Sequence, residues 1–163
     1  MKNISKHVSY KEATRSLVAK RNGWDNKPTD EQLARVVVLA EKVFEPLREA
    51  LGTPIYIHSM FRSPQVNKAI GGAKYSQHMC DNGAAMDIDS EIFGGTTNIE
   101  IGDYIRENLE FDQLIYESEN EEGKDYGWIH CSYNEGNNRK QVLVMYLESG
   151  RIKYKNFVDH DFS

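Results

Sequence analysis

The sequence predicts an α+β fold, in which helices pack on one side of an antiparallel sheet. Helical spacing of apolar residues dominates the first third of the chain, and segments of β type fill the last third. Helices come first and strands later, without the strand-helix-strand repetition that parallel sheets require. The chain has 163 residues and neither an internal repeat nor a linker, so we expect a single domain spanning residues 1–163.

Two capping boxes mark the predicted helix starts in the first third of the chain. Ser9 followed by Glu12 predicts a short helix over about residues 10–20, and Thr29 followed by Gln32 predicts the start of a second helix. In a capping box the two side chains satisfy backbone N–H groups that the first helical turn leaves without partners, so each pair indicates where a helix begins.

The second of these helices is long and amphipathic. Pro46 lies inside it and should kink it or end its regular part, and Gly52 is the expected stop. Its apolar residues recur at intervals of three and four, which is the spacing of one helix face: Leu33, Val36, Val37, Ala40, Val43, Phe44, Leu47 and Leu51.

Shorter segments complete the prediction. In chain order they are a strand over residues 54–59, a helix from Ser63-Pro64 to Gly71-Gly72, a strand over residues 84–89 and a helix from Thr97 to about Leu109. Four strands follow, over residues 111–117, 127–133, 141–147 and 151–157. Turn residues separate these four, so we expect an antiparallel meander.

Composition excludes several classes of protein. The net charge is −5 and no long block of Lys and Arg occurs, so we expect no nucleic-acid partner. No apolar run approaches the roughly 18 residues of a membrane span, and the first residues lack the apolar core of a signal peptide. We expect a monomer made in the cytoplasm. Cys80 and Cys131 form no CxxC pair and are interpreted as small buried residues.

The candidate chemistry lies in three residues that are far apart in the sequence. His78 precedes an Asn-Gly turn, Asp87 lies in the strand after that turn, and His130 lies in a later apolar strand. Zinc binds imidazole nitrogens and carboxylate oxygens, and catalytic zinc sites have three protein ligands and an open position. The alternative is that Asp87 caps a turn and His130 is hydrogen-bonded within the sheet.

These residues resemble the signature of the M15 family of zinc peptidases, S-x-H-x-x-G-x-A-x-D followed by a W-x-H strand. The matching positions are Ser76, His78, Gly83, Ala85, Asp87, Trp128 and His130. Upstream, Phe61-Arg62-Ser63-Pro64 with Asn67, Gly71 and Gly72 is similar to the family's YRSPxxN…GG segment. The similarity covers roughly residues 9–135, and the compact phage and prophage branch is the most similar.

The resemblance implies a function and a role for each residue. His78, Asp87 and His130 become ligands of a catalytic zinc ion in a surface cleft, and Arg62 holds a substrate carboxylate or carbonyl. Ser76 bonds the substrate or orients His78, or only caps the turn, whereas Trp128 is a cleft wall or a core residue. The family includes D-Ala-D-Ala carboxypeptidases and L-alanyl-D-glutamate endolysins of phages. It therefore implies peptidoglycan stem peptides as substrates, with action at the cell wall after release.

The chain departs from the family pattern in the spacing of its ligands. Asp87 stands nine residues after His78, whereas the family has seven, so two extra residues fall within Met79–Asn82. A turn accommodates such an insertion. Asp89 remains an alternative ligand, because it shares a strand face with Asp87. His58 lies in a strand nearby and is interpreted as a neighbour of the site and not as a ligand.

A second departure concerns the general base. Many family members carry an acidic residue three positions before the last histidine, where this chain has Gly127. We predict that Glu117 replaces it, since pairing of Glu117 with Trp128 across a hairpin would place Glu117 diagonal to His130. A slip of one residue would turn Glu117 to the other face. The loop alternatives are Glu121, Glu122 and Asp125. If none acts, the chain is a zinc-stabilised wall-binding or structural module of a phage particle.

Overall fold

The computed structural model describes residues 3–118 and 126–160. The helices in this part of the chain are α1 (Tyr10–Thr14), α2 (Leu17–Asn22), α3 (Asp30–Leu39), α4 (Glu45–Leu51), α5 (Pro64–Ala69) and α6 (Asn98–Asn108). A π-helical turn (Ala40–Phe44) joins α3 to α4, and a 3-10 turn (Gln77–Met79) precedes the second strand. The strands are β1 (Tyr56–Ser59), β2 (Ala84–Asp89), β3 (Gln113–Ser118), β4 (Tyr126–Tyr133), β5 (Gln141–Glu148) and β6 (Arg151–Asn156).

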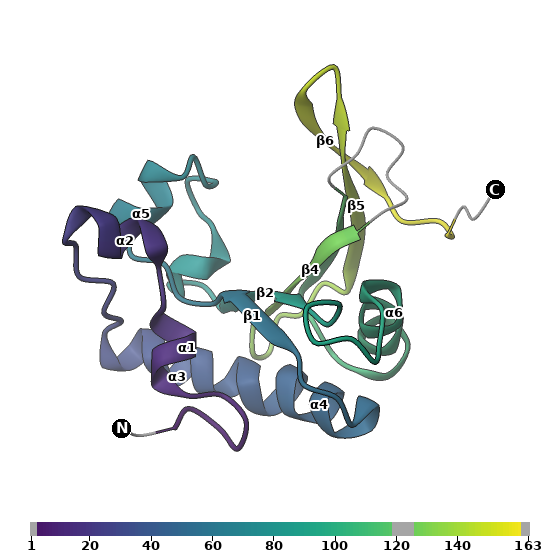
Figure 1. Ribbon diagram of the computed structural model, residues 1–163, viewed down its shortest axis with the longest axis horizontal. Helices are drawn as coiled ribbons and strands as arrows, with labels where there is room; N and C mark the ends of the chain where they lie inside the picture. The colour runs from purple at the N-terminus through teal and green to yellow at the C-terminus, as the bar shows by residue number, and fades with distance from the viewer. Residues whose placement is uncertain (1–2, 119–125, 161–163) are drawn as a thin grey trace.

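One six-stranded sheet organises the molecule, with the strand order β1-β2-β4-β3-β5-β6. Helices α3, α4 and α6 lie against one face of its first four strands, and the β5–β6 hairpin projects beyond them (Figure 1). The α+β fold class is therefore confirmed. None of the helices in residues 3–118 and 126–160 is long and apolar enough to span a bilayer.

The predicted meander is wrong about the partner of β5, which a meander would pair with β4. β3 and β4 form the expected antiparallel hairpin, but β5 runs parallel to β3. The reason is that β4 already pairs with β2 along its other edge, so β5 takes the free edge of β3. The connection over residues 134–140 is short, and it delivers β5 to the edge of β3 at the end where β3 begins.

An ion pair between a buried aspartate and an exposed arginine anchors this connection. Arg139 donates from Nε and Nη2 to the two carboxylate oxygens of Asp112, each at 2.9 Å, just before β3 begins. The backbone N–H of Gln141 donates to the carbonyl of Asp112 at 3.0 Å, so the same residue also sets the start of β5. Two parallel N–H···O bonds fix orientation as well as distance. Asp112 therefore holds β5 in register with β3.

The first helical segment is also interrupted where the sequence predicts continuity. Two short helices replace the single helix predicted over residues 10–20, because Arg15 adopts an extended conformation. Ser16 then caps α2 by accepting a hydrogen bond from the Ala19 N–H. Arg15 donates from Nη2 to the carbonyl of Ile57 at 2.6 Å, which ties the break to β1. A second serine cap and a tertiary contact thus override helix continuity.

The long helix changes its hydrogen-bonding pattern just before Pro46. The π-helical turn Ala40–Phe44 occupies the turn ahead of the proline, and Pro46 lies in the first turn of α4. Proline lacks an N–H and crowds the preceding turn, and a π turn is one way to accommodate both effects. Gly52 ends the helix with φ 66°, as predicted.

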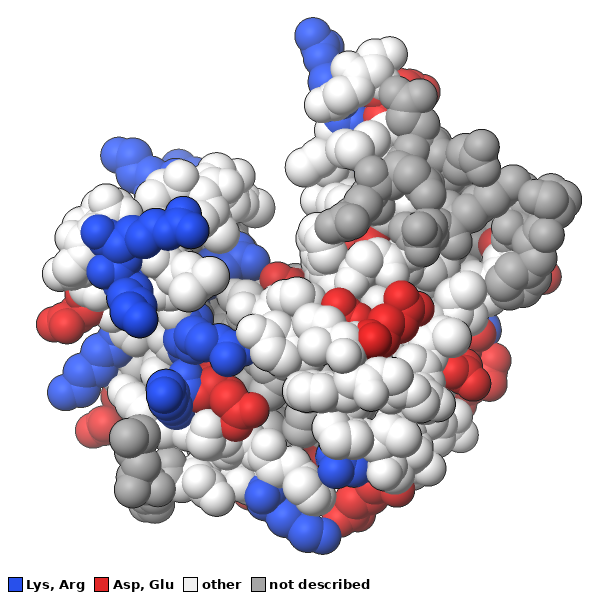
Figure 2. All heavy atoms as spheres, viewed as in Figure 1, with Lys and Arg blue, Asp and Glu red and all other residues white. Residues whose placement is uncertain are grey.

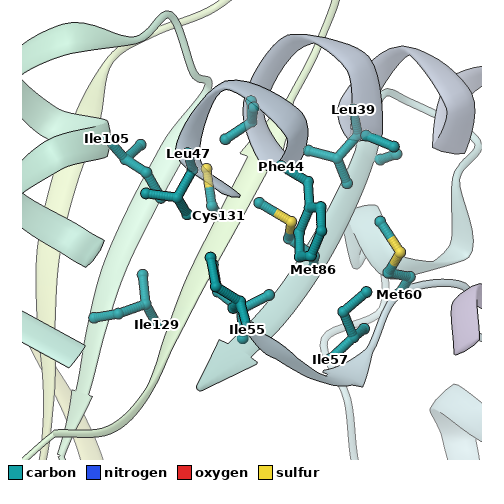
Figure 3. Close-up of a cluster of buried hydrophobic side chains, with 14 of the residues drawn as sticks. Leu39, Phe44, Leu47, Ile55, Ile57, Met60, Met86, Ile105, Ile129 and Cys131 are labelled. Carbon is teal, nitrogen blue, oxygen red and sulfur yellow. The ribbon is translucent and has the colours of Figure 1, made fainter. Parts of the chain in front are cut away.

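The hydrophobic core lies between these helices and one face of the sheet (Figure 3). Leu39, Phe44 and Leu47 project from the helical side, and Met86 and Ile129 project from the sheet (Figure 3). Burial of each such side chain contributes roughly 1.5–3 kcal/mol. The two cysteines are free and buried, which confirms their interpretation as small core residues. The helices thus cover one face of the sheet, and the opposite face is available for the candidate functional residues.

Candidate metal centre and substrate cleft

Asp87 and His130 lie on the sheet face that the helices leave open. They are directly opposite each other in the antiparallel pair of β2 and β4, so their side chains share that face. Asp87 Oδ1 lies 2.9 Å from His130 Nδ1. Met86 and Ile88 alternate with Asp87 and point into the core. The pleat of β2 therefore both anchors the strand and presents the carboxylate.

His78 reaches the same point from the 3-10 turn. The Ser76 hydroxyl accepts a hydrogen bond from the His78 N–H at 3.3 Å, and the His78 carbonyl accepts one from the Arg62 N–H at 2.8 Å. The ring nitrogen Nδ1 lies 2.7 Å from the carbonyl oxygen of Met60. A carbonyl only accepts, so Nδ1 carries the proton and Nε2 presents its lone pair to the cluster.

The separations within the cluster fit a metal ion. Among the described residues, ligand atoms of His78, Asp87 and His130 all lie within 4.8 Å of one another. His78 Nε2 is 3.3 Å from His130 Nδ1 and 3.2 Å from Asp87 Oδ2. Two ligand atoms at zinc-nitrogen or zinc-oxygen bond length from a tetrahedral ion lie about 3.3 Å apart. The three side chains thus already have the spacing of a coordination shell.

Two members of the cluster, His78 and Asp87, are held in the deprotonated states that bind a metal ion. Burial lowers the pKa of His78, so its imidazole is neutral. Burial alone would raise the pKa of Asp87, but the neighbouring His78 and His130 hold it well below its usual range. Burial would lower the pKa of His130, yet the hydrogen bond and charge of Asp87 outweigh it and raise that pKa. A metal ion would therefore compete with a proton at His130.

The turn between His78 and Asp87 absorbs the two extra residues. Cys80 adopts a left-handed conformation with φ 60°, and the Asp81 carboxylate turns away to accept a hydrogen bond from Gln32 at 2.9 Å. A Cβ at Gly83 would lie 2.5 Å from the carbonyl oxygen of Tyr133. Glycine at this position therefore lets the turn approach the end of β4.

Asp89, the alternative ligand, has other partners. Its Oδ1 accepts hydrogen bonds from the Glu91 N–H at 2.9 Å and from Asn98 Nδ2 at 3.1 Å, and its Oδ2 lies 3.2 Å from His58 Nε2. Asn98 also donates to the carbonyl of Tyr126, so this network braces β2 against β4. The geometry therefore favours Asp87, and it places His58 beside the cluster and outside the candidate ligand set.

Glu117 occupies the register on which its predicted role depends. It is opposite Trp128, and Ile115 is opposite His130, so Glu117 lies on the same sheet face as the cluster. Burial, together with the charge of Asp87, raises the pKa of Glu117 to about 7, while the charge of His130 opposes this shift. A carboxylate that titrates near neutrality is suited to accept a proton. The loop alternatives Glu121, Glu122 and Asp125 lie outside the described residues.

Arg62 is held at the edge of the cluster by three side chains. Its Nη2 donates to Asp87 Oδ2 at 3.2 Å, its Nη1 to Asn67 Oδ1 at 3.3 Å and its Nε to Ser59 Oγ at 3.2 Å. A Cβ at Gly72 would lie 2.1 Å from Asn67 Oδ1, so glycine there leaves room for the amide. The arginine, asparagine and glycine of the upstream motif therefore form one supporting unit.

The cluster, Arg62 and Glu117 line a cleft of about 770 Å³, which Ser76 and Trp128 also line. The open hollow is visible between two arms of the molecule, which are the side that carries α5 and the side that carries the β5–β6 hairpin (Figure 2). Trp128 borders the cleft, which favours its interpretation as a wall. Sequence reasoning missed the carbonyl of Met60, which no side-chain pattern signals. It also missed Met145, Ile152 and Tyr154, which line the cleft from the C-terminal hairpin.

Comparison with known families agrees with this geometry. The family model described as Peptidase M15 matches residues 6–132, which is most of the chain. The chain belongs to the peptidase M15 family. The matched range of this M15 peptidase contains the whole His-Asp-His cluster together with Arg62 and Glu117, and it ends before β5. Curated proteins give no significant match to the chain.

Proposed function

We propose that this M15 peptidase is a zinc-dependent enzyme that hydrolyses peptide bonds in peptidoglycan stem peptides, as a carboxypeptidase or an endopeptidase. The observation that carries the proposal is the cluster of His78, Asp87 and His130 at the base of an open cleft. Family membership supports a peptidase, and the donor set supports zinc. The substrate class rests on the family resemblance.

His78 Nε2, Asp87 and His130 Nδ1 would hold the ion. When bound, Zn²⁺ supplies Lewis acidity toward a carbonyl oxygen and lowers the pKa of water. Two imidazoles and one carboxylate leave the site with a positive charge, which favours this chemistry. The hydrogen bond from His78 Nδ1 to Met60 fixes the ring before the ion arrives, so little reorganisation is needed.

Two further residues would perform the remaining steps. Glu117 would accept a proton from the attacking water and deliver it to the leaving amine, since burial brings its pKa near neutrality. Arg62 would bind a carboxylate or carbonyl of the peptide. Its guanidinium is a permanent cation, and Asn67 and Ser59 fix its orientation. Trp128 would exclude water from one side of the cleft.

Metal depletion tests this proposal. Protein treated with EDTA should release no peptide from purified peptidoglycan, and one equivalent of zinc should restore the release. Asp87→Ala should remain inactive after zinc is added, while Asp81→Ala serves as a matched control, because Asp81 turns away from the cluster. Activity in the chelated protein would contradict the proposed mechanism.

The glycine at position 127 favours a second candidate function. Where many M15 members have an acidic residue, this chain has no side chain, so a wall-binding or structural module with bound zinc is the alternative. Co-sedimentation with peptidoglycan separates the two candidates. Sedimentation of the zinc-loaded protein without release of peptides supports the module, whereas release that Glu117→Gln abolishes supports the enzyme.

A further inference from the structure

The β5–β6 hairpin adds a wall to the cleft that the family match does not include. The match ends at residue 132, and the hairpin begins at Gln141. All residues of β6 are exposed, and the hairpin projects away from the core (Figure 1). An exposed strand at the edge of a sheet can pair with other chains unless charged side chains or other features prevent this.

The two faces of β6 differ in character. Ile152 and Tyr154 face the cleft, while Arg151, Lys153 and Lys155 occupy the alternate positions. Lysines on an edge strand discourage pairing with other sheets. The lysines do not account for Ile152 and Tyr154. These two side chains are 59% and 55% exposed, so burial in the core does not explain their presence either.

The register of the sheet connects Tyr154 to the candidate catalytic carboxylate. Trp128 is opposite Glu117, Glu117 is opposite Met145, and Met145 is opposite Tyr154. Residues opposite one another on neighbouring strands share a face, so these four side chains form one row across four strands. The charges of Glu117 and Asp87 act on the Tyr154 hydroxyl, which agrees with this row.

The opposite wall of the cleft also carries exposed apolar and aromatic side chains. Ile70 and Tyr75 lie in the segment after α5, are 46% and 82% exposed, and line the same cleft as Ile152 and Tyr154. Figure 2 shows that the cleft opens to solvent between the two arms. Apolar side chains therefore flank the metal cluster on both sides, in the place that an extended peptide would occupy.

We propose that the β5–β6 hairpin is the second wall of the substrate-binding cleft, where Ile152 packs on the peptide and the Tyr154 hydroxyl donates a hydrogen bond to its backbone beside the scissile bond. This inference rests on the proposed peptidase function. The occupant is the substrate, because the wall is continuous with the cluster through Glu117 and Met145. Burial and the nearby carboxylates raise the pKa of Tyr154, so the phenol remains a donor.

The test compares Tyr154→Phe and Ile152→Ala with the wild type on a soluble stem pentapeptide. Tyr154→Phe should lower kcat/KM about tenfold, which corresponds to one hydrogen bond of about 1.4 kcal/mol. Ile152→Ala should raise KM several-fold and leave kcat unchanged. Tyr146→Phe is the matched control, since Tyr146 lies on the other face of β5 beside Lys155. Zinc content should be one per chain in all variants.

A second arm keeps this test independent of turnover. Zinc-loaded Glu117→Gln should bind the same pentapeptide, and Tyr154→Phe in that background should weaken the binding measurably. If Tyr154→Phe matches the wild type in both kcat/KM and affinity, the inference is wrong while the peptidase function stands. If the wild type binds but does not cleave, the peptidase function fails, and the affinities alone decide the role of the hairpin. If neither occurs, both proposals fall.

Discussion

Replacement of Glu117 by glutamine separates catalysis from metal binding. Glutamine keeps the size of the side chain and can still accept the hydrogen bond that the Trp128 side chain gives to Glu117, but it cannot act as a base. General base catalysis contributes roughly 10²–10⁴-fold, or about 3–5 kcal/mol of transition-state stabilisation. Because Glu117 is not one of the three candidate ligands, Glu117→Gln should lower kcat by that factor and leave zinc content at one per chain.

The pH dependence of the rate strengthens this test. Burial raises the pKa of Glu117 to about 7 in the protein without metal, and a bound cation would lower it. The base acts in its ionised form, so kcat/KM should rise with pH through a midpoint below 7, and Glu117→Gln should lose this acidic limb.

The assay is the release of peptide from purified peptidoglycan, followed across pH. Glu148→Gln is the control, because Glu148 is exposed at the end of β5. A kcat within threefold of the wild type for Glu117→Gln would refute its role as the base.

Three further perturbations test the support of the site and its electrostatics. Arg62→Lys should raise KM about tenfold with unchanged zinc content, since an ammonium cannot keep the contacts with Ser59 and Asn67 and also bind the substrate; an unchanged KM would contradict this. Gly72→Ala should destabilise the protein by about 1–3 kcal/mol in denaturant unfolding, because its Cβ would meet Asn67 Oδ1 at 2.1 Å; equal midpoints would contradict the crowding. Without metal, Glu117→Gln should unfold at higher denaturant than the wild type at pH 8 and at the same denaturant near pH 4. Glu117 stays protonated up to about pH 7 in the folded protein but only to about pH 4.5 in the unfolded chain. The free energy of unfolding of the wild type therefore falls by roughly 3 kcal/mol between these two pH values. A difference that does not vary with pH would contradict this.

The sequence was sufficient for features that depend on local chemistry. Capping residues placed the starts of α1, α3 and α6, since a side chain that satisfies the first turn acts within a few residues. The sequence indicated the hairpin of β3 and β4 but left its register open by one residue, and the structure has the register that pairs Glu117 with Trp128. The convergence of His78, Asp87 and His130 was predicted only through the family resemblance, because their spacing alone is weak evidence.

Features that depend on distant parts of the chain were not predictable. The parallel pairing of β3 with β5 follows from the occupation of the free edge of β4 by β2, which no local pattern records. The break at Arg15 depends on its contact with the carbonyl of Ile57. The cleft-facing position of Tyr154 likewise needed the order of all six strands, because alternation along β6 does not say which face meets the cluster.

Anomalous diffraction at the zinc edge, from crystals grown with zinc, is the most direct measurement. A single strong peak should lie about 2 Å from His78 Nε2, Asp87 and His130 Nδ1, with Glu117 on the side of the open coordination position. A peak bound elsewhere, or no peak at this cluster in crystals saturated with zinc, would contradict the account.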